Sequence, residues 1–247
     1  MNYYRNFRMI ELIILIVILI ILAILTVPMM FHAGEKAKKV SCSGNLKQCV
    51  NALITYGVSN NNIICTSGNK YSGWYAQDGI PQLLGIKIDT NRSPLTARPV
   101  TLCPDIWINS PYRNPAQAYG AAWFTQRMDY SEEGCDVVTN FPTNQGQLVL
   151  LNKIPIPEDY VLLADSAYTS TEAPDIIPGL QCILFARQKA GAVSYFPRAI
   201  SLRHEGEANV GYADGHVGNT SDRTQMLIKS KIEAYIDPTG RMPIVTQ

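Results

Sequence analysis

A short segment near the C-terminal end holds most of the side chains that could bind a metal ion. These are His204, Glu205, Glu207, Asp214 and His216. Carboxylate oxygens and an imidazole can together hold a divalent cation, and Asp165 could approach from elsewhere in the fold. A structural divalent cation held by His204, Glu207, Asp214 and His216 is therefore one hypothesis for this segment.

A purely structural interpretation of the same residues is the one we favour. Strand alternation would send Glu205 and Glu207 to one face. The sequence has neither an H-E-x-x-H nor a G-x-S-x-G motif, so we expect no enzymatic site and no resident metal. We expect a hydrogen-bonded clasp instead. In it His204 donates to a loop carbonyl or to Asp214, and Asp165 ties the segment to a neighbouring strand.

The element that would position these residues is a β-hairpin. Residues 207–213 read as a strand, and His216 begins the return strand. Asp214 and Gly215 between them form a two-residue turn that readily adopts positive φ. Gly215 therefore belongs to the predicted clasp.

Six cysteines are spread along the chain: Cys42, Cys49, Cys65, Cys103, Cys135 and Cys182. No C-x-x-C occurs, so the sequence does not support a zinc ribbon or a thioredoxin-type site. Disulfides and small buried apolar side chains both stay open as interpretations. A bridge between Cys42 and Cys49 is excluded if both lie on one helix, because their Cα atoms would be about 10 Å apart.

The charge balance of the 247-residue chain argues against nucleic acid as a partner. Lys and Arg total 21, Asp and Glu total 20, and the net charge is +1. A nucleic-acid-binding domain normally carries a basic patch or stripe. The chain beyond residue 31 is long enough for one domain with its own core.

One uncharged run, residues 12–31, is the strongest feature of the sequence. Twenty helical residues reach roughly 30 Å, the thickness of the hydrocarbon layer of a membrane. Arg5 and Arg8 precede the run, which favours a cytoplasmic N-terminus and a head outside the membrane. The run is longer than the apolar core of a secretory signal, and no A-x-A follows it, so we expect it to be retained.

The helical pattern continues from Gly34 to Tyr56 with an apolar stripe and a lysine-rich opposite face. Pro28 should bend or locally open this helix because it removes a backbone donor. Gly57 and the asparagines after it should end the helix.

Farther along, short apolar runs alternate with turn residues. Strands are predicted at 80–88, 118–124, 147–151 and 160–164, short helices at 74–76 and 223–235, and loops at 94–115 and 169–179.

The N-terminal residues carry a family resemblance. Phe7-Arg8-Met9-Ile10-Glu11 before a long aliphatic run resembles the start of type IV prepilins and type II secretion pseudopilins. In that family a prepilin peptidase cuts just before the Phe, and the new amine is methylated. The resemblance implies that Glu11 meets the N-terminal amine of the next subunit, and that Pro28 is the family's helix-kinking proline. Asn6 stands where family leaders end in Gly, so an uncleaved anchor is the alternative to cleavage between Asn6 and Phe7.

The C-terminal segment adds a second resemblance. His204, nine intervening residues and Asp214-Gly215 resemble the H-X9-DG element of prepilin-like proteins of Planctomycetes and Lentisphaerae. Other pieces that fit that family are Cys42 with Asn45-Leu46-Lys47-Gln48, Cys103-Pro104, Ala118-Tyr119-Gly120 and Leu163-Ala164-Asp165-Ser166. Together these matches run over nearly the whole chain.

We therefore expect an α+β, pilin-like fold in which a long N-terminal helix packs on an antiparallel sheet with long loops. The expected parts are a leader-like cytoplasmic segment (1–8), a transmembrane helix (9–31), its amphipathic continuation (32–58) and an extracytoplasmic head (59–247) with the H-X9-DG hairpin (204–215).

The resemblance implies a structural subunit of a pseudopilus or secretion-associated fibre in the bacterial inner membrane. Its expected partners are the lipid bilayer, other pilin-like subunits, secretion-system components of the inner membrane and, if it is processed, prepilin peptidase. The first alternative is an uncleaved, membrane-anchored binding module. The second is a tethered metal-dependent hydrolase.

Overall fold

The computed structural model describes residues 9–67, 74, 79–86, 99–104, 119–123, 138–140, 147–168, 184–186, 198–220 and 235–236. The chain divides into two compact units, Met1–Lys38 and Lys39–Gln247, which we take in turn.

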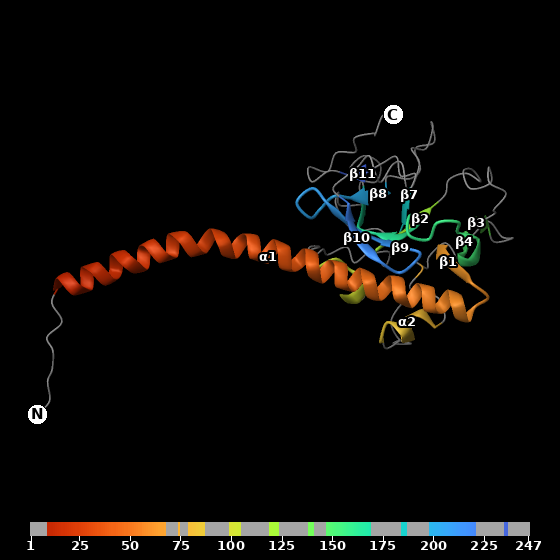
Figure 1. The fold of residues 1–247 in the computed structure, drawn as a ribbon, viewed down its shortest axis with the longest axis horizontal. Coiled ribbons are helices and arrows are strands. Elements are labelled where there is room, and N and C mark those ends of the chain that lie inside the picture. Colours follow the sequence, from red (N-terminus) through yellow and green to blue (C-terminus); the bar gives the residue numbers. More distant parts are fainter. Residues whose placement is uncertain are drawn as a thin grey trace, which may run out of the picture. The chain divides into compact units, whose positions relative to one another are not determined.

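A single helix, α1 (Met9–Ser59), makes up most of the described N-terminal region (Figure 1). Its backbone stays helical through Pro28, so the helix does not open there. The helix also runs two residues past Gly57, where we expected its end. A Cβ on Gly57 would lie 2.5 Å from Leu151 Cδ1 and 2.7 Å from Ile64 Cγ2. This glycine therefore permits close packing, and the chain turns afterwards at Asn61 and Asn62, whose φ values are 57° and 60°.

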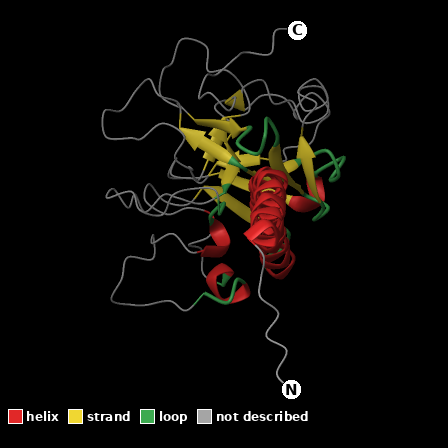
Figure 2. Ribbon diagram, turned by 90° about the vertical axis from the view of Figure 1, so that its left-hand side faces the viewer, coloured by secondary structure: helices red, strands yellow, loops and turns green. Residues whose placement is uncertain are grey.

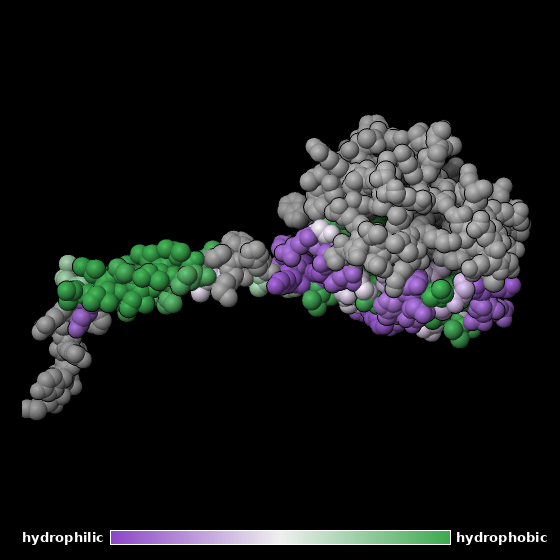
Figure 3. All heavy atoms as spheres, turned by 45° about the horizontal axis from the view of Figure 1, so that its top comes forward, coloured by the Kyte–Doolittle hydropathy of each residue, from purple (hydrophilic) through white to green (hydrophobic). Residues whose placement is uncertain are grey.

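The first part of α1 is apolar on every side. Met9–Val27 is long and apolar enough to cross a membrane, and none of its side chains is buried (Figure 3). A signal sequence near an N-terminus can meet the same criteria of length and composition, so these criteria alone do not separate it from a retained span. This segment is the one candidate span in the part of the chain that the structure describes.

The last part of α1 has an apolar stripe, as the sequence predicts. Its members recur every three or four residues and are completely buried: Cys42, Leu46, Cys49, Val50 and Leu53. They join Tyr119, Leu162 and Leu163 in the main core. Since this spacing follows the helical period, one face of the helix supplies a continuous wall of the core.

Three small sheets form the described part of the head. The first has the order β1 (Ile63–Ser67), β4 (Gln147–Leu150), β3 (Val138–Asn140). The second has the order β10 (Val217–Thr220), β9 (Ala208–Tyr212), β5 (Val161–Ala164), β2 (Gly120–Trp123), β7 (Leu184–Ala186). The third has the order β11 (Tyr235–Ile236), β8 (Arg198–Ser201), β6 (Ser166–Tyr168).

The described part of the head is therefore α+β with mainly antiparallel sheets, as expected, although its strands are divided among three sheets. Most neighbouring strands are antiparallel, whereas β2 with β7 and β8 with β11 are parallel. The predicted strands at 118–124, 147–151 and 160–164 correspond to β2, β4 and β5. All four residues of β5 are buried, as expected for a central strand that is covered on both faces.

The predicted strand at 80–88 is wrong where it is described. Ile80–Leu83 is a short helix, α2, which begins at Gly79 (φ 96°) and ends before Gly85 (φ 64°). Pro81 lies in its first turn, a position that suits proline because no helical partner is needed for its nitrogen. Residues 75–76, 94–98, 105–115, 169–179 and 223–234 of the other predicted elements lie outside the described residues. Within the predicted loop, Pro99–Thr101 is a short 3-10 helix, and the predicted helix at 223–235 is wrong at Tyr235, which begins β11.

The central sheet contacts α1 through a glycine. An added Cβ on Gly211 of β9 would lie 2.3 Å from Val50 Cγ2 and 3.6 Å from Leu46 Cγ. Because Gly211 has no side chain, its strand packs directly against the apolar stripe of the helix. Figure 2 looks down the axis of α1 and shows the strands beside it. Val161, Ala164, Ile200, Leu202, Ala208 and Val210 form a second core cluster, which links β5 and β9 to β8.

Candidate functional site

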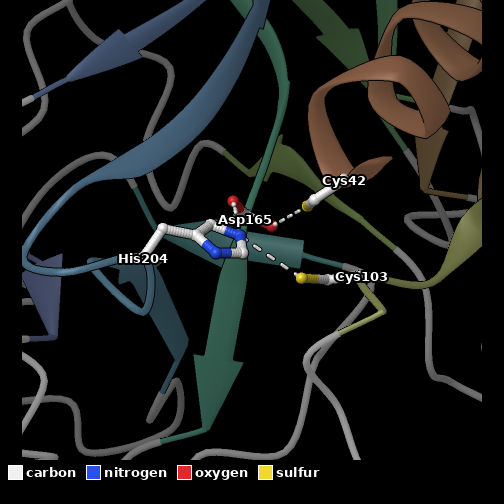
Figure 4. Close-up of side chains that lie close together, drawn as sticks. All are labelled: Cys42, Cys103, Asp165 and His204. Atoms are coloured by element: carbon white, nitrogen blue, oxygen red, sulfur yellow. Dashed lines mark hydrogen bonds and ion pairs between the residues drawn. The ribbon is translucent and has the colours of Figure 1, made fainter. Parts of the chain in front are cut away.

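Four side chains from four separate segments meet inside the head, and we call them the buried cluster: Cys42, Cys103, Asp165 and His204 (Figure 4). Each offers one atom that could bind a metal, and these atoms all lie within 4.8 Å of one another. All four residues are buried. Among the described residues this is the group that could hold a metal ion.

Cys42 comes from α1, at the start of the buried stripe. Its Sγ donates to Asp165 Oδ1 at 3.2 Å and lies 3.3 Å from the hydroxyl of Tyr119. That hydroxyl donates to the Cys42 carbonyl at 3.0 Å. Tyr119 immediately precedes β2, so the central sheet and the helix both fix this thiol.

Cys103 follows a short 3-10 turn, η2 (Pro99–Thr101). Two side chains of α1 hold this segment: Cys49 Sγ donates to the Val100 carbonyl at 3.3 Å, and Asn45 Nδ2 donates to the Leu102 carbonyl at 3.3 Å. Cys103 Sγ lies 3.3 Å from His204 Nε2. The helix therefore supplies one cysteine and positions the other.

Asp165 lies between β5 and β6, where the chain leaves the central sheet for the third sheet. Its amide donates to the Asn209 carbonyl at 3.0 Å, and its carbonyl accepts from Ser201 at 2.9 Å. Its Oδ2 accepts from the backbone nitrogen and Nδ2 of Asn209 at 2.9 and 3.1 Å. Asp165 thus ties β9 to its neighbours, and its carboxylate is fixed from two sides.

His204 is held by a tight turn between β8 and β9. His204 and Glu207 exchange two backbone hydrogen bonds of 3.0 Å across Glu205 and Gly206. Both central residues have positive φ, 53° and 87°, which is the geometry of a type I′ hairpin turn. The turn aims the His204 ring inward, and its Nε2 lies 3.3 Å from Asp165 Oδ2.

The side chains of the buried cluster shift one another's pKa values. Burial alone would raise the pKa of Asp165, but the hydrogen bond with His204 and the charge of Arg203 outweigh burial and lower it. Burial alone would lower the pKa of His204, yet its bonds with Asp165 and Cys103 raise it to about 9. The hydrogen bond with Cys42 is the main cause that lowers the pKa of Cys103 to about 6. Burial raises the pKa of Cys42.

The geometry separates the residues of the predicted clasp into two groups. His204 and Asp165 lie together in the buried cluster. Asp214 lies instead beside His216, with its Oδ1 2.6 Å from His216 Nδ1, and accepts from the His216 amide at 3.0 Å. His204 thus pairs with Asp165, whereas we expected a loop carbonyl or Asp214.

The hairpin turn around Gly215 is longer than predicted. Tyr212 and His216 close it, with the Tyr212 amide donating to the His216 carbonyl at 2.9 Å, so three residues form the loop. Gly215, the third of them, has φ 93°. Lys47 Nζ of α1 donates to the Gly215 carbonyl at 2.5 Å. The glycine therefore serves the turn and also presents a contact to the helix.

The four suggested cation ligands do not meet at one point. Only His204 belongs to the buried cluster. Glu207 instead pairs with Lys39 of α1, and His216 stacks on Tyr212 with 4.2 Å between ring centroids. The two lysine contacts, Lys39 with Glu207 and Lys47 with Gly215, place both ends of the H-X9-DG segment against α1.

The residues implicated in processing and assembly lie at the chain start. Asn6 and Phe7 are outside the described residues. Glu11 lies exposed in the first turn of α1, and Pro28 continues its helical backbone.

Sequence reasoning missed Cys42 and Cys103 as partners of Asp165 and His204. The cysteines stand far apart, without the short spacing that marks most zinc sites. A signal was available in the sequence, because the segments quoted for the second resemblance contain Cys42, Cys103, Asp165 and His204.

Comparisons with protein-family models, with curated proteins and with solved structures found no match to this chain.

Proposed function

We propose that this protein is a membrane-anchored structural subunit of a pilin-like or secretion-associated fibre. The observation that carries the proposal is that the two ends of α1 have different surroundings. Residues Met9–Val27 are apolar with no buried side chain, while Cys42–Leu53 supply one wall of the core of the head. A helix that anchors at one end and builds a domain at the other suits a subunit that packs helix against helix.

The exposed apolar surface must be covered by something other than water. The large apolar residues along Met9–Val27 are each between 46% exposed, as at Leu12, and 78% exposed, as at Met9. Such a patch marks a membrane or protein interaction site. The bilayer covers it before assembly, and helices of neighbouring copies cover it in a fibre. Ala23 is the one small side chain in the run, so close GxxxG-type pairing is not expected.

The resemblance of Phe7–Glu11 to the start of prepilins supports assembly over simple anchoring, because it implies that Glu11 meets the N-terminal amine of the next subunit. A neighbouring subunit can supply the positive partner, its new N-terminal amine, once prepilin peptidase has cut between Asn6 and Phe7. Arg5 and Arg8 orient the leader toward the cytoplasm, which puts the head outside the bacterial inner membrane.

The second candidate function is an uncleaved, membrane-anchored binding module. Asn6 favours it, because the residue before the cut is the one the peptidase reads. In this case Met9–Val27 is only an anchor, and secretion-system components of the inner membrane are not partners.

The mass of the N-terminus in native membranes tests the proposal. A methylated chain that begins at Phe7 is expected. An intact Met1 in the membrane fraction would support the uncleaved module and contradict the fibre proposal. A chain that begins beyond residue 27 in the soluble fraction would identify the segment as a signal sequence.

A matched pair of variants tests the role of Glu11. Glu11→Ala should abolish assembly, measured as cross-linked oligomers in membranes. Glu35→Ala is the control, because Glu35 is an exposed acid on the same helix that pairs with Lys38 at 2.8 Å. Equal oligomer yield from Glu11→Ala and from the unaltered chain would refute the role of the charge.

A further inference from the structure

We propose that Cys42, Cys103, Asp165 and His204 bind one Zn²⁺ ion in a closed structural site that fastens α1 to the head. The ion would join four segments that lie far apart in the sequence. This inference goes beyond the proposed function and holds whether the chain assembles or only anchors.

The distances in the buried cluster fit tetrahedral zinc. Zn–S bonds of about 2.3 Å and Zn–N or Zn–O bonds of about 2.0–2.1 Å put neighbouring ligand atoms roughly 3.3–3.8 Å apart. Two observed separations between ligand atoms are close to this range: 3.2 Å from Cys42 Sγ to Asp165 Oδ1, and 3.3 Å from His204 Nε2 to Cys103 Sγ. The other carboxylate oxygen, Oδ2, lies 3.3 Å from His204 Nε2. Since all four ligand atoms lie within 4.8 Å of one another, only small side-chain movements are needed.

The ligand types select zinc over the other common divalent ions. Two thiolates and an imidazole are soft or borderline ligands, which suit Zn²⁺. Ca²⁺ and Mg²⁺ instead require six or more oxygen ligands, and the buried cluster offers only the carboxylate.

Charge balance also fits a bound dication. Two thiolates and one carboxylate carry three negative charges, and the neutral imidazole adds none. Zn²⁺ offsets two of them, and Arg203 acts on Asp165 and Cys103 with a further positive charge. Binding releases to solvent the protons that the two thiols and the His204 ring still carry in the metal-free protein, leaves the Nε2 lone pair of His204 on the ion, and transfers no electrons.

Outer contacts already hold the ligands in place. Asn209 donates twice to Asp165 Oδ2, which leaves Oδ1 toward Cys42. The hydroxyl of Tyr119 lies beside Cys42 Sγ. Such second contacts orient ligands in zinc sites.

The number of ligands decides the kind of site. Catalytic zinc keeps one position open for water or substrate, whereas four protein ligands close a structural site. All four ligand residues are buried: His204 is 4% exposed, Cys103 is 1% exposed, and Cys42 and Asp165 are 0% exposed. The proposed site is therefore a structural zinc site and not a catalytic one.

A Cys42–Cys103 disulfide is the competing use of the same two thiols. It would join α1 to the segment after η2 but would leave Asp165 and His204 outside the link. The two possibilities differ in mass and in metal content, so one purified sample distinguishes them.

The test uses the full chain in detergent, loaded with Zn²⁺ or Co²⁺ and dialysed. We expect one metal ion per chain by elemental analysis, and the absorption bands of tetrahedral cobalt with thiolate-to-cobalt charge transfer. Absence of these bands, or a native mass that shows Cys42 and Cys103 disulfide-linked, would overturn the proposal.

A cysteine pair provides the matched variants. Cys103→Ser should weaken Co²⁺ binding by more than the roughly 10–100-fold that loss of an outer contact costs. Cys65→Ser, at a buried thiol on β1 outside the cluster, should leave binding unchanged. Unchanged affinity in Cys103→Ser would contradict the assignment.

A measurement on the unaltered chain covers the case in which Cys103→Ser does not fold. Alkylation at a denaturant concentration that partly unfolds the head, followed by peptide mapping, should label Cys42 and Cys103 faster after EDTA treatment than when Zn²⁺ is present, because a bound ion protects both thiols. Identical labelling under the two conditions would count against the site.

Discussion

The two ends of the H-X9-DG segment each contribute one residue to an Asp–His pair, His204 with Asp165 and Asp214 with His216, and the two pairs differ in their surroundings. His204 and Asp165 are 3.3 Å apart, with side chains 2% and 0% exposed. His216 and Asp214 are 2.6 Å apart, with side chains 47% and 37% exposed. The shorter contact lies in solvent, and the longer one lies in the interior beside two thiols.

Burial, not distance, decides what each pair contributes. An exposed ion pair is screened by water and salt and typically contributes about 0–1 kcal/mol. Breaking a buried pair leaves an uncompensated charge or polar group and costs about 3–5 kcal/mol. The shorter pair is therefore expected to be the weaker contributor to stability, and the following experiments test this ranking.

The largest effect is expected from Asp165→Asn. It removes the charge that faces His204 and weakens the acceptor used by Asn209 and Cys42. We expect a loss of about 3–5 kcal/mol in the free energy of unfolding, measured by urea denaturation in EDTA. A loss under 1 kcal/mol would mean that the buried pair contributes no more to the free energy of unfolding than the exposed pair does.

The next effect tests the strand that joins the two pairs. Gly211→Ala places a Cβ within 2.3 Å of Val50 Cγ2, so β9 or α1 must shift. Overpacking of this kind costs about 1–3 kcal/mol in the free energy of unfolding. Gly218→Ala on β10 is the control, because the atom nearest to its added Cβ, Tyr212 Cε2, would lie 3.5 Å away, an ordinary contact distance. Equal losses would mean that the helix contact does not set the position of the strand.

The protonation state of His204 tests whether Asp165 and its buried surroundings act on the ring. In metal-free protein its raised pKa, about 9, keeps the ring charged at pH 7.5, and the charge is lost as the pH rises through 9. Zinc requires the neutral ring, so its addition at pH 7.5 should deprotonate His204. NMR of the ring signals follows both changes, and Asp165→Asn should lower the pKa. A ring that titrates near 6.5 without metal would contradict the predicted environment.

The sequence predicts the helix, strand and hairpin that hold these pairs better than it predicts which side chains contact one another. The apolar stripe of α1 and the buried strand β5 follow from local periodicity, and the hairpin at Gly215 follows from its turn residues. The pairing of His204 with Asp165 does not, because four distant segments must converge before these side chains meet. The two-residue turn at Glu205 and Gly206 was also missed, since Glu is an uncommon residue at positive φ. That turn decides which way His204 points.

The smallest effect is expected from Asp214→Asn, the same substitution at the exposed pair. Asparagine can still accept from the His216 amide, so the variant removes the charge and keeps the turn bond. We expect a loss of at most about 1 kcal/mol in the free energy of unfolding, which shrinks further in high salt because exposed charges are screened. Urea denaturation at low and high NaCl measures both. A salt-independent loss equal to that of Asp165→Asn would show that contact distance outranks burial in this protein.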